Sequence, residues 1–473
     1  MTPGLPGPTP TSGRVPGPHG CGGRAAVAVA VLGAYAAFAA EPPAIGAKNP
    51  PPEPLIFACQ AAQRPDLVRA GTALVAGTDG WIFRMDDLRG DFVVQPGTVE
   101  ALKHFVDAWA ARGTHVALVL LPPRGVLGAA NVDRSQPLAT AFDAATITAA
   151  YRGAIRSLAG TGATVPDLLA AAGNAKLGER FFFRRDHHWT PEGARLAMTT
   201  VVAQLPPAMP AFTPVPYTNI ADKQRSLPGE LTRLLQKECG GEGYPPERFS
   251  PYLSRPSEQA ITGDSLLGDA PPPEVVVAGS SHTNKGMQDT FNVAGWLREA
   301  TGTDVLNVGV DGGGFSTGLL NWIDTDAARK SPPKLLVWEI SGRIPDGLAD
   351  FFREALPTVH GACAEPLQVV HATVGSSPVH LFTVEAPSRA RDHYIFLTVS
   401  DPAFVEFRVG FDTQDGAHDS VLVRRSTRIP NSRRYFVSGP DSDSPLRAIS
   451  IRGGLIVQAQ VDARLCAVPS VQK

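Results

Sequence analysis

Continuous apolar runs alternate with stretches of helical spacing up to about residue 340 of the chain. The runs are typical of strands buried on both faces, and the spacing between them is typical of helices that cover such strands. Repeated strand–helix–strand units predict a parallel sheet with right-handed crossovers. The expected strands are 81–83, 115–121, 163–167, 274–278, 304–310 and 334–340, and the expected helices are 99–111, 144–158, 291–300 and 315–329.

The pattern changes from about residue 365, where short apolar runs are separated by turn residues and show no helical period. This spacing predicts a β-sandwich. The expected strands are 369–374, 379–384, 394–399, 404–409, 420–423, 434–437, 448–451 and 455–460.

The predicted fold class is therefore α/β, with a parallel-sheet domain over residues 55–350 and a C-terminal all-β sandwich domain over 360–473. Ahead of them, the uncharged apolar run 25–40 follows Arg14 and Arg24 and ends in small residues. This is typical of an export signal, so we predict a cleaved signal peptide over 1–40 and a Pro-rich arm over 41–54. An uncleaved anchor is the alternative.

Composition and cysteine content agree with export. The 473 residues give room for two or three domains, and the net charge of −2 gives no reason to expect a nucleic-acid partner. Four cysteines remain after the predicted signal, an even number that indicates two disulfides in an oxidising compartment. Of three pairings we favour Cys59–Cys239 and Cys363–Cys466, because each stays within one domain; buried free thiols are the alternative. The absence of a C-x-x-C motif argues against a zinc site or redox motif.

A candidate catalytic set lies on two predicted loops. Asp186 stands two residues before His188, just ahead of a helix that Thr190 can cap, and Ser281 follows the apolar strand 274–278. Asp, His and Ser are the parts of a nucleophilic acyl-transfer site. We therefore predict Ser281 as nucleophile, His188 as base and Asp186 as the group that orients it. Ser280 is the competing nucleophile.

Other interpretations of these loops are weaker. A metal site of Asp186, His187 and His188 lacks the H-E-x-x-H spacing, and we expect His187 to point away from the triad and His282 to diverge from Ser281. The loop 309–314 lacks the spacing of a phosphate-binding loop and is expected near the pocket. Gly279, Asn307 and Arg343 are the candidates for the oxyanion site or the pocket.

A cluster of arginines marks the C-terminal domain. Arginine side chains suit carboxylate ligands, so an acidic polysaccharide is a natural partner, with Arg424, Arg428 and Arg433 as the binding candidates. A solvated basic edge strand is an equally good interpretation. The cluster consists of Arg424, Arg425, Arg428, Arg433 and Arg434, beside Tyr435.

Five segments together resemble the alginate O-acetyltransferase family of AlgX and AlgJ, whose catalytic domains are SGNH hydrolase-like. They are GTDGWIF (77–83), LPPRG (121–125), RDHHWTPEGA (185–194), AGSSHT (278–283) and PKLLVWEISGR (333–343). The C-terminal sandwich looks like the carbohydrate-binding module of the AlgX branch. The resemblance covers residues 55–345, and the turn reads Gly-Ser-Ser here where Gly-Thr-Ser is usual in the family.

The resemblance implies an SGNH hydrolase-like acetyltransferase domain that works in the periplasm, contains two disulfides and uses the triad Ser281, His188 and Asp186. It implies acetyl transfer to an acidic, alginate-like exopolysaccharide, with acetyl supplied by a membrane-bound O-acyltransferase and with association with an exopolysaccharide secretion complex. The reaction needs no metal and no organic cofactor. A periplasmic acetylesterase with the same triad and a non-catalytic polysaccharide-binding scaffold are the alternatives.

Overall fold

The computed structural model describes residues 59–240, 243–257, 272–286, 288–340, 342–385, 388–454 and 458–469. The predicted signal peptide (1–40) and Pro-rich arm (41–54) lie outside the described residues. Within these ranges no helix combines the length and the apolar character needed to cross a membrane.

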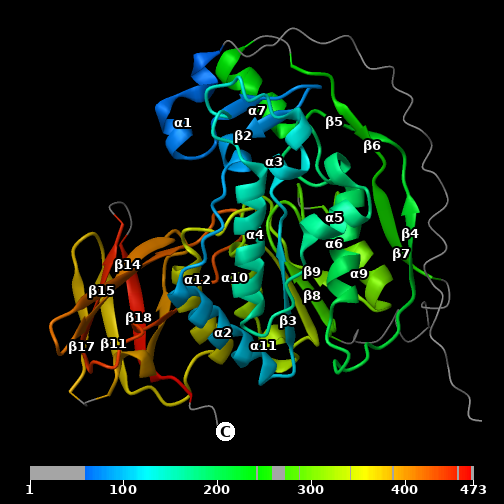
Figure 1. The fold of residues 1–473 in the computed structure, drawn as a ribbon. Helices are drawn as coiled ribbons and strands as arrows, with labels where there is room; N and C mark the ends of the chain where they lie inside the picture. The colour runs from blue at the N-terminus through cyan, green and yellow to red at the C-terminus, as the bar shows by residue number, and fades with distance from the viewer. Residues whose placement is uncertain are drawn as a thin grey trace, which may run out of the picture. The chain divides into compact units, whose positions relative to one another are not determined.

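A four-stranded sheet forms the centre of the first part of the chain (Figure 1). Its order is β3-β10-β8-β9, and each neighbouring pair is parallel. Every residue of β8 and β10 is buried, which explains why the sequence shows continuous apolar runs instead of alternation. The parallel sheet predicted from the sequence is therefore confirmed. The strands are β3 (His115–Leu120), β8 (Val275–Ala278), β9 (Val305–Asn307) and β10 (Leu335–Ile340).

Helices cover both faces of this sheet, and alternate strand residues point to opposite layers. Leu118 and Trp338 belong to one hydrophobic cluster and Val119 and Val337 to the other. The first cluster includes side chains of α2 (Pro96–Ala110), α4 (Ala144–Ala159), α10 (Thr317–Ile323) and α12 (Leu348–His360). The second includes side chains of α5 (Leu168–Asn174), α6 (Pro191–Ala203) and α9 (Val293–Thr301).

Three expected elements differ from the structure. Residues 455–457 of the predicted strand 455–460 lie outside the described residues, and the observed strand β18 covers Ala459–Ala467. The predicted helix 315–329 is divided into α10 and α11 (Asp326–Lys330), because the Thr325 hydroxyl accepts a hydrogen bond from the Ala328 N–H and starts a new helix. The predicted strand 163–167 is reduced to one bridge between Thr164 and Ala117.

Smaller elements accompany this sheet between residues 60 and 256, and most of them had no clear signal in the sequence. The Cys59–Cys239 disulfide joins the residue before the 3₁₀ turn η1 (Gln60–Gln63) to the last residue of α7 (Glu230–Cys239). The hairpins are β1 (Leu74–Ala76) with β2 (Ile82–Arg84), β4 (Tyr217–Ala221) with β7 (Tyr252–Pro256), and β5 (Arg225–Leu227) with β6 (Glu247–Phe249). The helices are α1 (Pro65–Arg69), α3 (Arg124–Leu127), α7 (Glu230–Cys239) and the 3₁₀ turns η1 (Gln60–Gln63), η2 (Met85–Leu88), η3 (Ala129–Asn131) and η4 (Gly178–Phe181).

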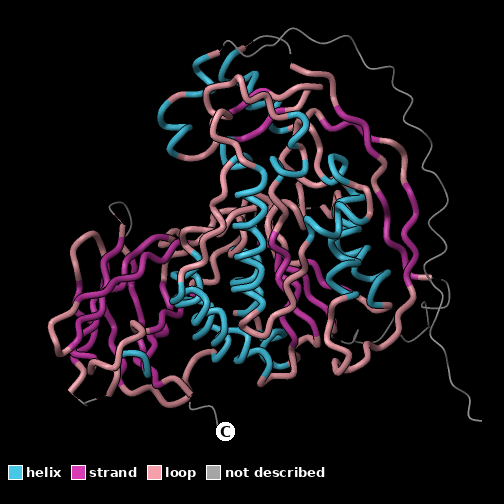
Figure 2. Tube along the Cα trace, viewed as in Figure 1, coloured by secondary structure: helices cyan, strands magenta, loops and turns pink. Residues whose placement is uncertain are grey.

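The C-terminal region contains two four-stranded antiparallel sheets, the magenta strands at the lower left of Figure 2. Their inward side chains form a single apolar cluster, as expected for a sandwich. The predicted all-β domain is confirmed, and the second predicted disulfide, Cys363–Cys466, is present. One sheet is β11 (Gln368–Val374), β18 (Ala459–Ala467), β13 (His393–Val399) and β16 (Arg434–Ser438); the other is β12 (Val379–Thr383), β17 (Leu446–Gly453), β14 (Glu406–Thr413) and β15 (His418–Arg424). A short 3₁₀ turn, η6 (Ala390–Asp392), precedes β13.

Candidate active site

Residues 182–190, here named the base loop, form a tight hairpin ahead of α6. Phe183 N–H donates to the His188 carbonyl at 3.2 Å, and the Thr190 hydroxyl accepts from Gly193 N–H at 3.1 Å as the helix cap. Trp189 Nε1 donates to the backbone carbonyl of His282 at 2.8 Å. The loop is therefore tied both to its own helix and to the segment after β8.

Arg124 holds the base loop from the other side. This buried guanidinium donates to the backbone carbonyls of Ile82, Phe183 and Arg184 at 2.6–2.8 Å and pairs with Asp87 at 3.0 Å. Burial lowers the pKa of Arg124, and Asp87 opposes that shift. The segments GTDGWIF and LPPRG thus meet the base loop around one cation.

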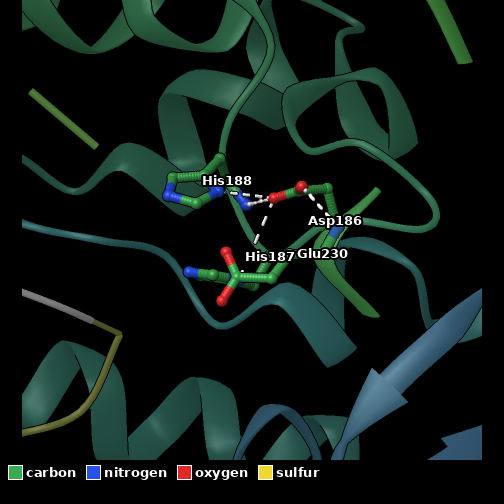
Figure 3. Close-up of side chains that lie close together, drawn as sticks. All are labelled: Asp186, His187, His188 and Glu230. Atoms are coloured by element: carbon green, nitrogen blue, oxygen red, sulfur yellow. Dashed lines mark hydrogen bonds and ion pairs between the residues drawn. The ribbon is translucent and has the colours of Figure 1, made fainter. Parts of the chain in front are cut away.

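The three predicted catalytic side chains form one chain of hydrogen bonds. His188 Nε2 lies 2.8 Å from Ser281 Oγ, and His188 Nδ1 lies 2.5 Å from Asp186 Oδ1. Figure 3 shows the imidazole and the carboxylate facing each other. The carboxylate accepts further bonds from His188 N–H at 3.0 Å and from Glu230 N–H at 2.8 Å.

The electrostatics keep Asp186 charged. Burial alone would raise the pKa of Asp186, but the hydrogen bond and charge interaction with His188 and the charge of Lys285 outweigh it and lower that pKa. A carboxylate at Nδ1 selects the tautomer with the proton on that nitrogen. Nε2 is then free to accept the proton of the Ser281 hydroxyl.

His187 was expected to point away from the triad, and this expectation was wrong. Its ring centroid lies 4.0 Å from that of His188, and its Nδ1 lies 3.2 Å from Nη2 of Arg84 and 3.8 Å from Oε2 of Glu230. Burial and the neighbouring positive groups lower the pKa of His187 well below its usual range, so the ring is neutral. A neutral imidazole can accept a hydrogen bond from the Arg84 guanidinium.

One ligand atom from each of Asp186, His187, His188 and Glu230 lies within 4.8 Å of the others, a spacing that could hold a metal ion (Figure 3). The same atoms already bond to one another or to Arg84, and Lys285 Nζ lies 3.5 Å from Glu230. Two cations against the cluster disfavour a third. Its chemistry therefore suits proton transfer better than metal binding.

Residues 279–283, here named the nucleophile turn, follow β8 at the carboxyl edge of the sheet. Among the described residues the backbone N–H of Ser281 has no hydrogen-bond acceptor, so it is available to an oxyanion. Ser280 points inward, where its N–H and its hydroxyl both bond to Glu339. Ser281, and not Ser280, therefore faces the base.

The three oxyanion and pocket candidates, Gly279, Asn307 and Arg343, differ in the groups that they contact. Asn307 uses its amide to donate to the Thr283 carbonyl at 2.8 Å and to accept from Gly309 N–H at 2.9 Å, so it supports the turn from behind. Gly279 lies against Glu339. Arg343 is 41% exposed and pairs with Asp86 at 3.7 Å and Asp346 at 3.5 Å.

A model of one protein family, described as the SGNH hydrolase-like domain of the acetyltransferase AlgX, matches residues 74–342, more than half of the chain. The chain belongs to this family. The AlgX of Pseudomonas aeruginosa is 28% identical over 381 residues, covering 79% of this chain and 78% of that protein. The AlgX of Azotobacter vinelandii is 30% identical over 354 residues, covering 72% and 70%.

A solved structure of Pseudomonas aeruginosa AlgX has the same fold. It superposes with a TM-score of 0.72 at 23% identity and covers 87% of this chain and 99% of that one. The fold of the AlgX family therefore extends through both sheet regions described above.

Sequence reasoning missed three residues of this AlgX-family site, Arg124, Glu339 and Glu230. Arg124 was noted only as part of the LPPRG segment, and Glu339 only as part of the segment 333–343. Glu339 carried a signal, because it is a lone carboxylate inside a wholly buried strand, and buried charges are rare without a purpose. Glu230 had no comparable signal, because it approaches Asp186 only through the path of α7.

Proposed function

We propose that this protein is an O-acetyltransferase that transfers acetyl to an acidic, alginate-like exopolysaccharide through a Ser281–His188–Asp186 triad. The observation that carries the proposal is the unbroken chain from Ser281 Oγ to Asp186 Oδ1 at 2.8 and 2.5 Å. Membership of the AlgX family adds support. So does the relative from Azotobacter vinelandii named as a probable alginate O-acetylase AlgJ, which is 27% identical over 281 residues.

The proposed reaction has two half-reactions. Ser281 Oγ attacks the acetyl carbonyl of an ester donor while His188 Nε2 takes the hydroxyl proton, and Asp186 stabilises the imidazolium. His188 returns that proton to the departing alcohol, which leaves an acetyl-enzyme. His188 then takes the proton of a sugar hydroxyl, whose oxygen attacks the acetyl carbonyl. The bond from the acetyl group to Ser281 Oγ breaks, and His188 returns the proton to Oγ. The Ser281 N–H is the proposed oxyanion donor.

The sandwich is the proposed polysaccharide-binding module, and its arginines divide into two groups. Arg425 and Arg434 pair with Glu354 and Asp324, so they join the sandwich to α12 and to the loop after α10. Arg424, Arg428 and Arg433 are exposed. An ideal Cβ at Gly312 would lie 3.0 Å from Arg428 Nε, so this arginine reaches the loop 309–314 whose Gly309 carbonyl binds Asn284. A polymer held there would pass close to the nucleophile turn.

We further propose that the protein is exported to the periplasm, where a membrane-bound O-acyltransferase delivers acetyl and an exopolysaccharide secretion complex presents the polymer. The two disulfides support an oxidising compartment. The apolar run 25–40 supports a signal peptide.

The test is mass spectrometry of mannuronate and guluronate oligosaccharides incubated with 4-nitrophenyl acetate and the protein. We expect a gain of one acetyl mass on the sugar with the wild type, none with Ser281→Ala, and wild-type yield with Ser135→Ala, which changes an exposed serine in another loop. Nitrophenol release without acetylated sugar would replace the proposal with an acetylesterase. No turnover by any variant, with oligosaccharide still bound, would replace it with a polysaccharide-binding scaffold.

A further inference from the structure

A second polar chain lies behind the triad, and the proposed reaction does not use it. Glu339 is the fifth residue of the buried strand β10 and is 0% exposed, whereas the other five residues of this strand are apolar. An isolated buried carboxyl group costs several kcal/mol relative to an apolar side chain, so its presence requires a reason.

Both hydrogen bonds of Glu339 go to the nucleophile turn. Its Oε2 accepts from the Ser280 backbone N–H at 2.7 Å and from the Ser280 hydroxyl at 2.8 Å. The turn comes unusually close to this carboxyl group, because an ideal Cβ at Gly279 would lie only 2.5 Å from Oε2. A glycine at 279 is therefore needed for Glu339 to reach Ser280.

The chain continues from Ser280 to the base. Because the Ser280 hydroxyl proton goes to Glu339, Ser280 Oγ accepts a hydrogen bond from the His282 backbone N–H at 3.2 Å, and His282 Nε2 lies 3.2 Å from the His187 carbonyl. A carbonyl can only accept, so Nε2 carries the ring proton and Nδ1 has a free lone pair. The His282 ring in turn packs on His188, with centroids 4.7 Å apart.

The second carboxyl oxygen of Glu339 faces the ring of His282. Oε1 is buried, has no hydrogen-bond partner among the described residues, and lies 3.9 Å from Nδ1 of His282. Burial raises the pKa of Glu339 to about 7, against the opposing effect of the Ser280 bonds, and burial keeps His282 neutral by lowering its pKa. A proton on Oε1 of Glu339 would point toward Nδ1 of His282, whose lone pair is free.

We propose that Glu339 is a positioning residue for acyl transfer, which fixes the nucleophile turn through Ser280 and the rotamer of the base through His282. The residues on both sides of Ser281 belong to this chain, so its loss would free Ser281 Oγ from the 2.8 Å contact with His188. Misplacement of a reacting atom by about 1 Å lowers a rate by about a hundredfold. The inference rests on the proposed nucleophile Ser281, but not on the identity of the donor or the acceptor.

The test measures the rate at which phenylmethylsulfonyl fluoride modifies Ser281, read by peptide mass spectrometry, with the exposed Ser135 as reference in the same sample. The variants are Glu339→Gln, which keeps an acceptor for Ser280, and Glu339→Leu, which has similar volume and no polar atom. We expect Glu339→Leu to react about a hundredfold more slowly than the wild type and Glu339→Gln within about threefold of it. The matched control is Glu354→Gln, another buried carboxyl group, on α12, which we expect to react at the wild-type rate.

A purely structural role makes the opposite prediction. Leucine removes a costly buried polar group, so Glu339→Leu would then be at least as stable as the wild type and equally reactive. Equal reactivity of Glu339→Leu and the wild type would overturn the inference, and so would a Glu339→Gln protein as slow as Glu339→Leu, because charge and not hydrogen bonding would then be responsible. If wild-type Ser281 reacts no faster than Ser135, the inference also fails.

A second pair of variants decides the question if Glu339→Leu does not fold. Ser280→Ala removes one of the two bonds and is expected to slow modification about tenfold, whereas Ser280→Thr keeps the hydroxyl and the rate. Equal rates for this pair would overturn the inference. Because sulfonylation needs neither acetyl nor sugar, these rates stay informative if the oligosaccharide assay gives no acetylated product.

Discussion

Among the described residues, buried polar side chains are common in the parallel-sheet region and rare in the sandwich. Around the parallel sheet, buried polar side chains gather at the carboxyl edge, where Asp186, His188, Ser280, His282 and Glu339 are each at most 8% exposed. Between β11 and β18, only His393 and Thr413 are comparably buried among the described residues, and the candidate binding arginines are exposed.

Under the proposed function, this difference corresponds to a division of work between catalysis and polymer binding. Reactive groups need a low-dielectric site in which charges interact strongly and geometry is fixed, and this is what buried strand ends provide. Recognition of a charged polymer needs hydrated cations on a stable surface, which a sandwich with an apolar core provides. Substitutions of similar kind should therefore have large effects in the first region and small ones in the second.

The largest effect is expected for Asp186→Asn. The amide cannot hold the Nδ1–H tautomer of His188, so acetyl-ester turnover should fall by about 10⁴-fold with the fold retained. The measurement is the initial rate of nitrophenol release, with circular dichroism as the check on folding. The matched control is Asp289→Asn, a capping aspartate at the start of α9, which should keep its rate within about threefold. A loss of turnover smaller than tenfold in Asp186→Asn would contradict the orienting role of Asp186.

Replacement of Arg124 by Met should destabilise the protein by about 3–5 kcal/mol, because it leaves three backbone carbonyls and Asp87 without their donor. Urea denaturation followed by Trp fluorescence measures this. Arg425→Met is the counterpart at the sandwich, where the partner Glu354 has a pKa raised by burial and can be neutralised by a proton. A smaller loss is expected there, and equal losses would break the comparison between the regions.

Glu339 should make stability depend on pH. Its pKa rises from 4.5 in the unfolded chain to about 7 in the fold, so the folded state binds the proton more tightly. The free energy of unfolding should fall as pH rises from 4.5 to 7 and then level off, by about 3 kcal/mol in total. Glu339→Gln removes this contribution, so its stability relative to the wild type should increase over the same window in urea titrations. A constant difference between the two proteins would contradict the raised pKa.

The smallest effects are expected at the exposed arginines of the sandwich. Arg424→Ala, Arg428→Ala and Arg433→Ala should each weaken binding of a uronate oligosaccharide by about threefold, and less at high salt, because exposed charges are screened. Calorimetry at two salt concentrations measures this. Arg391→Ala is the control on the same domain, because Arg391 lies outside the cluster and pairs with Asp441 and Asp443 much as Arg424 pairs with Glu406. Unchanged affinity in a variant that carries all three alanine substitutions would favour a solvated basic edge over a binding surface.

The sequence by itself determined the elements and the kinds of chemistry. Periodicity is local, so the four strands of the parallel sheet, most strands of the sandwich, the Thr190 cap and the change of architecture near residue 365 could be predicted from neighbouring residues. The grouping of cysteines by domain was enough to predict both disulfides. The residue types at 186, 188 and 281 were enough to predict a triad.

Only the tertiary structure decided which side chains meet. Strand order and register place Glu339 of β10 beside the turn after β8, because Trp338 pairs with Ala278 and the next residues of both strands lie side by side. The path of α7 brings Glu230 N–H to Asp186. The packing of α12 and of the loop after α10 separates Arg425 and Arg434 from their exposed neighbours. Such contacts join residues far apart in sequence, and no local pattern encodes a distance that depends on how whole layers pack.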